Sequence, residues 1–215
     1  MPSTTIGNAV DKFVRAFFAG EDVETSPLAQ NLSEETKKHL REELEKIKTS
    51  AEKGGWKIVS NGIVASGTIM VKDANGDKMA IRVAGTLDLL LYNSEKDEYA
   101  IYDMKTHRSA VDNQKELDWA AQLSLYKQLL EIKFPELRGK IKALRIIPFS
   151  TSGYDANKQN YDKDSEGRLT SNGEIVKVNV KYDGKTIDLT DKEMNLDISF
   201  ARPGFKKEYV EGEGA

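Results

Sequence analysis

An acid and an amine lie two positions apart, Asp103 and Lys105, inside the strand-like segment EYAIYDMKTHR. Successive side chains of a β-strand point to opposite faces, so Asp103 and Lys105 face the same way as Ile101. Burying an unpaired charge beside an apolar residue is costly, so the two groups need each other, further polar groups, a metal ion or water. A common exposed ion pair at a strand end is the ordinary alternative.

A second acid, Asp88, interrupts the apolar segment AGTLDLLLYN in the same way. If this segment and the Asp103 segment form a hairpin with a four-residue turn over 94–97, then Tyr92 pairs with Tyr99 and Asp88 lies directly opposite Asp103. Opposed carboxylates repel unless a cation lies between them. Since unpaired buried acids are rare, the second acid favours a functional site over a surface ion pair.

Two carboxylates and a lysine suit metal-assisted hydrolysis. Asp88 and Asp103 offer oxygen ligands that favour Mg²⁺ or Mn²⁺, and the backbone carbonyl of Met104 is a further candidate ligand. Such an ion can polarise a phosphodiester and lower the pKa of a bound water, while the Lys105 ammonium orients that water or stabilises the developing negative charge. This chemistry needs no side-chain nucleophile.

Hydrophobic periodicity predicts the elements that must position these residues. The predicted elements are helices over 3–20, 33–53 and 114–133, strands over 57–65, 68–73, 78–93 and 98–106 in an antiparallel meander, and a strand over 141–149. This order indicates an α/β (α+β) fold, in which helices flank a central mixed β-sheet that contains the meander.

A chain of 215 residues suits one globular domain. We expect the core of the fold in residues 1–150. Residues 151–215 are expected to be a C-terminal elaboration packed on the same domain, made of a flexible loop over 152–174 and a β-hairpin that turns at Asp183-Gly184.

Composition excludes several kinds of site. The chain has no cysteine, so disulfides, thiolate zinc sites and iron–sulfur clusters are ruled out, as fits a reducing cytosol. We find neither a secretory signal nor an apolar run of about 20 residues that would span a bilayer, and we expect a cytoplasmic protein without a membrane partner. The net charge of −3 means that phosphate contacts would come from local basic residues or bound cations.

Three ordered motifs make the sequence resemble the PD-(D/E)xK nuclease superfamily, specifically its RecB-like branch without iron–sulfur cysteines. The motifs are Gly85-x-x-Asp88, Asp103-x-Lys105 and Gln122-x-x-x-Tyr126. The resemblance implies a restriction-endonuclease-like core in which the two acids bind metal and the lysine is catalytic. It also implies that the Gln and Tyr, which share one helical face, organise the site and the nucleic-acid strand.

The same branch carries an early Gly-x-x-x-His element whose histidine joins the metal ligands. Here Gly7 begins the matching segment and Asp11 replaces the histidine, so the resemblance implies Asp11 as a third oxygen ligand. An acid early in a helix is equally explained by the helix dipole.

Further residues have a functional and an ordinary interpretation. His107, Arg108 and Lys115 are candidate phosphate contacts, although charges on loops are usually solvated. Taken alone, Gln122 would be a solvated helix residue and Tyr126 a core residue; only their place in the series of motifs favours a role in the site.

We therefore expect a metal-dependent nuclease that hydrolyses phosphodiester bonds, with DNA exonuclease as the leading expectation. The resemblance suggests DNA repair or recombination, in a phage or bacterium. Endonuclease action, RNA as substrate, and single- or double-stranded DNA all fit the motifs. One alternative is a nuclease-fold module that binds nucleic acid or a partner within a helicase–nuclease or replication assembly without cutting alone. Another is a small-molecule hydrolase with the same metal ligands, which a closed pocket would favour.

Overall fold

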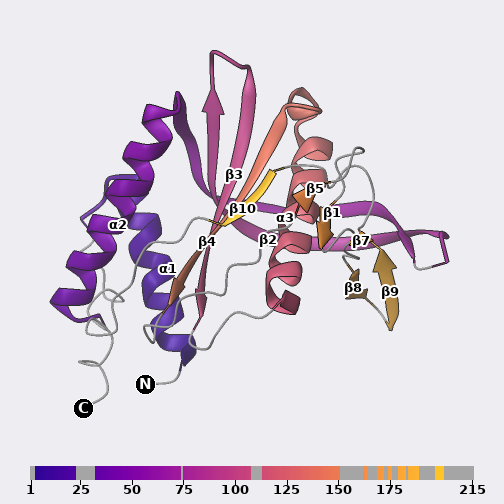
Figure 1. The fold of residues 1–215 in the computed structure, drawn as a ribbon, viewed down its shortest axis with the longest axis horizontal. Helices are drawn as coiled ribbons and strands as arrows, with labels where there is room; N and C mark the ends of the chain where they lie inside the picture. Colours follow the sequence, from indigo (N-terminus) through magenta and orange to yellow (C-terminus); the bar gives the residue numbers. More distant parts are fainter. Residues whose placement is uncertain are drawn as a thin grey trace.

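The computed structural model describes most of the chain up to residue 150 and short segments beyond it. The described residues are 3–22, 32–73, 75–107, 113–150, 162–163, 169–171, 174–175, 179–182, 184–188 and 197–200. The helices are α1 (Ser3–Ala19), α2 (Glu34–Lys53), α3 (Asn113–Lys133) and the 3₁₀ helix η2 (Pro135–Leu137). These helices confirm the three predicted from periodicity, and Figure 1 shows α1 and α2 together, apart from α3.

A mixed seven-stranded sheet is the centre of the fold, in the order β10-β4-β3-β2-β1-β9-β8. Its strands are β1 (Trp56–Asp73), β2 (Lys78–Asn93), β3 (Glu98–His107), β4 (Ile141–Ser150), β8 (Asn179–Tyr182), β9 (Lys185–Asp188) and β10 (Asp197–Phe200). The meander β1-β2-β3 is antiparallel, whereas β4 is parallel to β3 and to β10. The predicted fold, a mixed sheet with an antiparallel meander and flanking helices, is confirmed.

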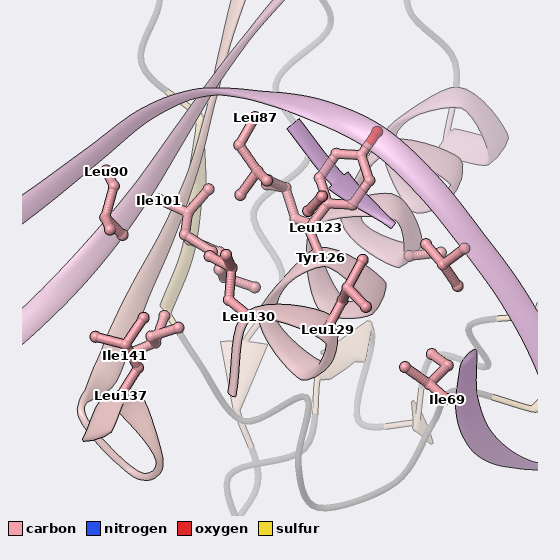
Figure 2. Packing of buried hydrophobic residues seen from close by; sticks show 14 of the residues in the cluster. Ile69, Leu87, Leu90, Ile101, Leu123, Tyr126, Leu129, Leu130, Leu137 and Ile141 are labelled. Carbon is pink, nitrogen blue, oxygen red and sulfur yellow. The ribbon is translucent and has the colours of Figure 1, made fainter. Parts of the chain in front are cut away.

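The helices cover opposite faces of the sheet. One buried cluster, the α1/α2 cluster, includes Val10, Phe13, Leu40, Leu44, Leu89, Leu91, Ala100, Tyr102 and Phe149. The other, the α3 cluster, includes Leu87, Leu90, Ile101, Leu123, Tyr126, Leu129, Leu130 and Leu144, and Figure 2 shows part of it. Alternation along β3 explains the division, because Ala100 and Tyr102 face one cluster and Ile101 the other.

The sheet opens into a fork between β2 and β3. These strands pair from Asn93–Glu98 only as far as Leu89–Tyr102. Beyond that point β2 remains paired with β1 and β3 with β4. In Figure 1 the long β1–β2 hairpin accordingly leaves the other strands and extends to the right.

Strand β1 is longer than predicted. The segments 57–65 and 68–73 were expected to be separate strands, but Ser66 and Gly67 pair with Ala84 and Val83 without interruption. A Cβ on Gly67 would lie 2.7 Å from Leu129 Cδ1, so glycine here lets α3 approach the strand closely. The expectation of a break was wrong because the glycine serves packing and not a turn.

Close approach also fixes α1 against the sheet. A Cβ on Gly7 would lie 3.1 Å from Thr106 Oγ1 on β3, so the absence of a side chain there brings the helix next to the strand. The carbonyl of Arg15 accepts a hydrogen bond from Asn61 Nδ2 on β1 at 3.3 Å. The helix therefore contacts strands on both sides of the fork.

The C-terminal part contributes strands to both ends of the sheet. Strands β8 and β9 pair antiparallel with each other, β9 pairs with β1, and β10 pairs with β4, while Asp183 of the predicted turn lies outside the described residues. A separate small sheet contains β5 (Asp162–Lys163), β6 (Leu169–Ser171) and β7 (Glu174–Ile175). Most of the predicted loop over 152–174 lies outside the described residues, and the domain boundary at residue 150 stays a prediction. No helix in the described part of the chain is long and apolar enough to cross a membrane.

Candidate functional site

The two acids lie at the fork. Asp88 and Asp103 are 5% and 2% exposed, and Asp88 Oδ2 accepts a hydrogen bond from the Met104 backbone N–H at 2.7 Å. The predicted register is correct up to Leu89–Tyr102, but the ladder does not continue to a direct Asp88–Asp103 pair. Two ionised carboxylates repel each other, which disfavours a direct pair. The Asp88 carboxylate instead accepts from the Met104 amide, which has no partner on β2 because the β2–β3 ladder has ended.

Strand β2 changes faces at Asp88. Leu89 and Leu91 pack in the α1/α2 cluster, yet Leu87, two residues before Leu89, packs in the α3 cluster. Across from Asp88 on β1 is Gly62, whose φ of +59° is the left-handed conformation that glycine adopts without steric cost. The change of face therefore falls at Asp88, next to the point where the β2–β3 ladder ends.

Burial raises the pKa of both acids. For Asp88 it rises from 3.8 to about 7, chiefly by desolvation and next by the negative charge of Asp103; the Met104 hydrogen bond and Arg15 oppose the rise. Desolvation also raises the pKa of Asp103, against the lowering effect of the Lys105 ammonium. For both acids the effect of burial outweighs that of the nearby positive charge, which is typical of a cation-binding or catalytic site.

Lys105 is placed as predicted. Its Nζ lies 2.7 Å from Asp103 Oδ2, and its side chain is 21% exposed at the edge of the site. The two atoms form a buried ion pair, and the interactions with Lys105 and Asp88 lower the pKa of Asp103 against the larger effect of burial.

Helix α1 supplies one predicted residue and one that the motifs missed. Asp11 Oδ2 lies 3.2 Å from Arg15 Nε, and an Arg15 Nη lies 3.6 Å from Asp88 Oδ1. The guanidinium thus joins the two acids, and it lies beside Gly62, where a Cβ would be 3.6 Å away. Its spacing of four from Asp11 on one helix was the signal that could have identified Arg15.

A divalent cation fits this donor set. The described residues contain no group of three His, Cys, Asp or Glu side chains already placed to hold a metal ion, and Arg15 and Lys105 form ion pairs with Asp88 and Asp103. The carboxylate oxygens of the buried Asp88 and Asp103 are nevertheless hard donors of the kind that Mg²⁺ and Mn²⁺ prefer.

Gln122 and Tyr126 meet on α3, as their spacing predicts. Gln122 Nε2 donates to the Tyr126 hydroxyl at 2.9 Å. The ring is buried in the α3 cluster, and in Figure 2 its oxygen points away from the neighbouring apolar side chains. The hydroxyl packs directly on Gly85, where a Cβ would collide with it. This contact explains the glycine of Gly85-x-x-Asp88 and joins two of the sequence motifs physically.

The predicted phosphate contacts are not placed. Arg108 and the side chains of His107 and Lys115 lie outside the described residues. A role of the Met104 carbonyl as a metal ligand stays a prediction, although the amide of the same residue does bind Asp88.

Comparison with known proteins identifies the family. A family model described as the PD-(D/E)XK nuclease superfamily matches residues 2–182, which is most of the chain. A search of curated proteins found no match to the chain.

Proposed function

Because the chain belongs to the PD-(D/E)xK nuclease superfamily, we propose that it is a metal-dependent DNA exonuclease of the RecB-like kind. Its mixed sheet with flanking helices is the restriction-endonuclease-like core. The observation that carries the proposal is the pair of buried acids at the fork, Asp88 and Asp103, with Lys105 Nζ 2.7 Å from Asp103.

In this proposal Asp88 and Asp103, with Asp11 from α1, hold Mg²⁺ or Mn²⁺. An ion held there would supply Lewis-acid chemistry: polarisation of the phosphodiester and a lower pKa for a water molecule. Lys105 lies at the exposed edge of the site, where its ammonium orients the attacking water and stabilises negative charge on the phosphate. The water gives up a proton to solvent as its oxygen bonds to phosphorus, and the bond to the leaving sugar oxygen breaks as that oxygen takes up a proton from solvent.

Gln122 and Tyr126 are positioning residues in this account. Their hydrogen bond fixes the tyrosine hydroxyl on Gly85, three residues before Asp88. A packed contact at this point restricts how far β2 can move, and so supports the placement of the Asp88 carboxylate.

Several finer assignments belong to the same proposal. We assign phosphate contacts to His107, Arg108 and Lys115, and a supporting C-terminal elaboration to residues 151–215. A helicase or replication protein is the proposed partner and the cytoplasm the proposed location; the lack of cysteine supports the latter.

The test is cleavage of end-labelled linear DNA, single- and double-stranded, with Mg²⁺, with Mn²⁺ and with EDTA. We expect cutting from an end that requires metal and falls by about 10³-fold or more in Asp103→Ala and Lys105→Ala. Covalently closed circular DNA is the control for exonuclease action, and it should stay intact. Metal-dependent binding of DNA without cutting would instead indicate the module that acts within a larger assembly.

A further inference from the structure

A cavity of about 400 Å³ lies between β2 and α3, beside the acid site. Its walls are mainly apolar and include Ile81 and Val83 of β2 and Trp119 and Leu125 of α3. Gln122 and Tyr126 line it as well, so the cavity shares two residues with the candidate active site.

The fork explains why there is a cavity here. Beyond Leu89 the edge of β2 that faces away from β1 has no strand partner in the described part of the chain. Helix α3 packs on this region through Leu129 and Tyr126, whose contacts are with Gly67 and Gly85. The cavity occupies the space between this part of β2 and the middle turns of α3.

The lining has the chemistry of a nucleobase site. Trp119 is half-buried and presents an aromatic surface among aliphatic side chains, while the exposed Arg82 and Asp118 supply polar groups at the rim. A nucleobase has flat apolar faces and hydrogen-bonding edges, and stacking on aromatic side chains is the usual way in which proteins bind single strands.

From this geometry, and resting on the proposed nuclease function, we propose that the cavity binds one unpaired nucleobase of the strand being cut, with Trp119 as its stacking partner. Continuity through Gln122 and Tyr126 places this base next to the phosphodiester held at Asp88 and Asp103. A base inside a duplex is paired and stacked and cannot enter a pocket without leaving the helix. The substrate is therefore a single strand or a frayed end.

Tryptophan emission tests the proposal without any cleavage. The chain has two tryptophans, and Trp56 lines a different cavity with Phe17 and Phe18 of α1. We expect a short oligothymidylate, added in EDTA, to quench the emission of the wild type and of Trp56→Phe but not of Trp119→Phe. No binding by the wild type, or equal quenching in Trp119→Phe, would overturn the proposal.

Removing bases from the oligonucleotide gives a second test. An oligothymidylate with abasic sites should bind the wild type about tenfold more weakly than the intact strand, as loss of one stacked base predicts. Trp119→Ala should bind the intact strand about tenfold more weakly than the wild type does, and its affinity for the abasic strand should fall no further. Trp119→Phe should bind the intact strand nearly as tightly as the wild type does. Equal affinity of the wild type for abasic and intact strands would contradict base binding, even if Trp119→Ala does not fold.

The experiments distinguish failure of the proposed exonuclease function from failure of the proposed base site. Base-dependent binding in EDTA without cleavage in Mg²⁺ would sink the exonuclease and keep the base site. Metal-dependent cleavage with base-independent binding would sink the base site and keep the nuclease.

Discussion

Arg15 is the residue that changes the interpretation of the acid site. Its guanidinium contacts Asp11 at 3.2 Å and Asp88 at 3.6 Å, in the region where the family motifs place a metal ion. The guanidinium and a divalent cation would compete for the negative charge of Asp88. We therefore expect Arg15 to stabilise the metal-free site and to move off Asp88 when an ion binds.

Replacing Arg15 should strengthen metal binding. In Arg15→Gln the competing charge is gone, and we expect Mn²⁺ affinity to rise about two- to fivefold, the range expected for a partly exposed ion pair. Titration calorimetry measures this affinity. Lys12→Gln, which removes the same charge from an exposed position of α1, is the matched control and should leave affinity unchanged. Weaker binding in Arg15→Gln would mean that the guanidinium supports the ion.

The raised pKa of Asp88 predicts a pH-dependent cost in stability. The pKa of Asp88 rises on folding from 3.8 to about 7, so the folded protein binds this proton more tightly than the unfolded chain does. The resulting stability is fully present below about pH 4 and is lost as the pH rises through about 7. Asp88→Asn should consequently raise the melting temperature of the metal-free protein by about 5 °C at pH 8 and by less at pH 5.

Thermal melts in EDTA at the two pH values check this. Asp97→Asn is the control, because Asp97 is exposed and Lys140, with its Nζ 2.6 Å away, lowers the Asp97 pKa. That substitution should give no gain at either pH. An equal gain for Asp88→Asn at both values would contradict the assigned pKa.

At the scale of elements, the fork between β2 and β3 creates the site. Alternation alone predicted that Asp103 and Lys105 share a face, and the turn over 94–97 predicted the hairpin register. The end of the ladder could not be predicted from either segment, because β2 is also held by β1 and by α3, which lie outside both segments. Long-range pairing of this kind leaves no local sequence signal.

The contact between Gly85 and Tyr126 gives a test of how α3 holds β2. Gly85→Ala places a methyl group against the tyrosine hydroxyl and ring, so we expect a loss of about 1–3 kcal/mol in the free energy of unfolding and reduced cleavage. Tyr126→Leu removes the colliding atoms. The double variant should therefore lose less free energy of unfolding than the two single losses added together, and urea unfolding measures these losses. If the losses in free energy of unfolding simply add, position 85 and the Tyr126 side chain are not in direct steric contact.

At the scale of the whole molecule, an acidic chain has to bind a polyanion. The sequence predicted the fold, the two acids and the lysine, since each shows in local patterning. It did not predict Arg15, which reaches the acids from a helix more than 70 positions earlier in the chain than Asp88. Nor did it predict the cavity beside α3, because a cavity results from the arrangement of several elements and not from one segment.

Charge at the fork should oppose DNA binding when no metal is present. Asp88→Asn with Asp103→Asn changes the net charge from −3 to −1, and we expect single-stranded DNA to bind severalfold more tightly than to the wild type in EDTA at low salt. Fluorescence anisotropy measures the affinity. Glu42→Gln with Glu45→Gln, at exposed positions of α2, gives the same net charge away from the site and should have a smaller effect. Equal gains in both double variants would mean that only net charge matters.

The most direct test of the central claim is the position of a bound metal ion in crystals grown with Mn²⁺. We predict an anomalous difference peak between the carboxylates of Asp88 and Asp103, with the Arg15 guanidinium turned away from Asp88 and Lys105 beside the ion. A protein that binds no manganese at the fork, with Arg15 still on Asp88, would contradict the assignment of these acids as the metal-binding centre of the nuclease.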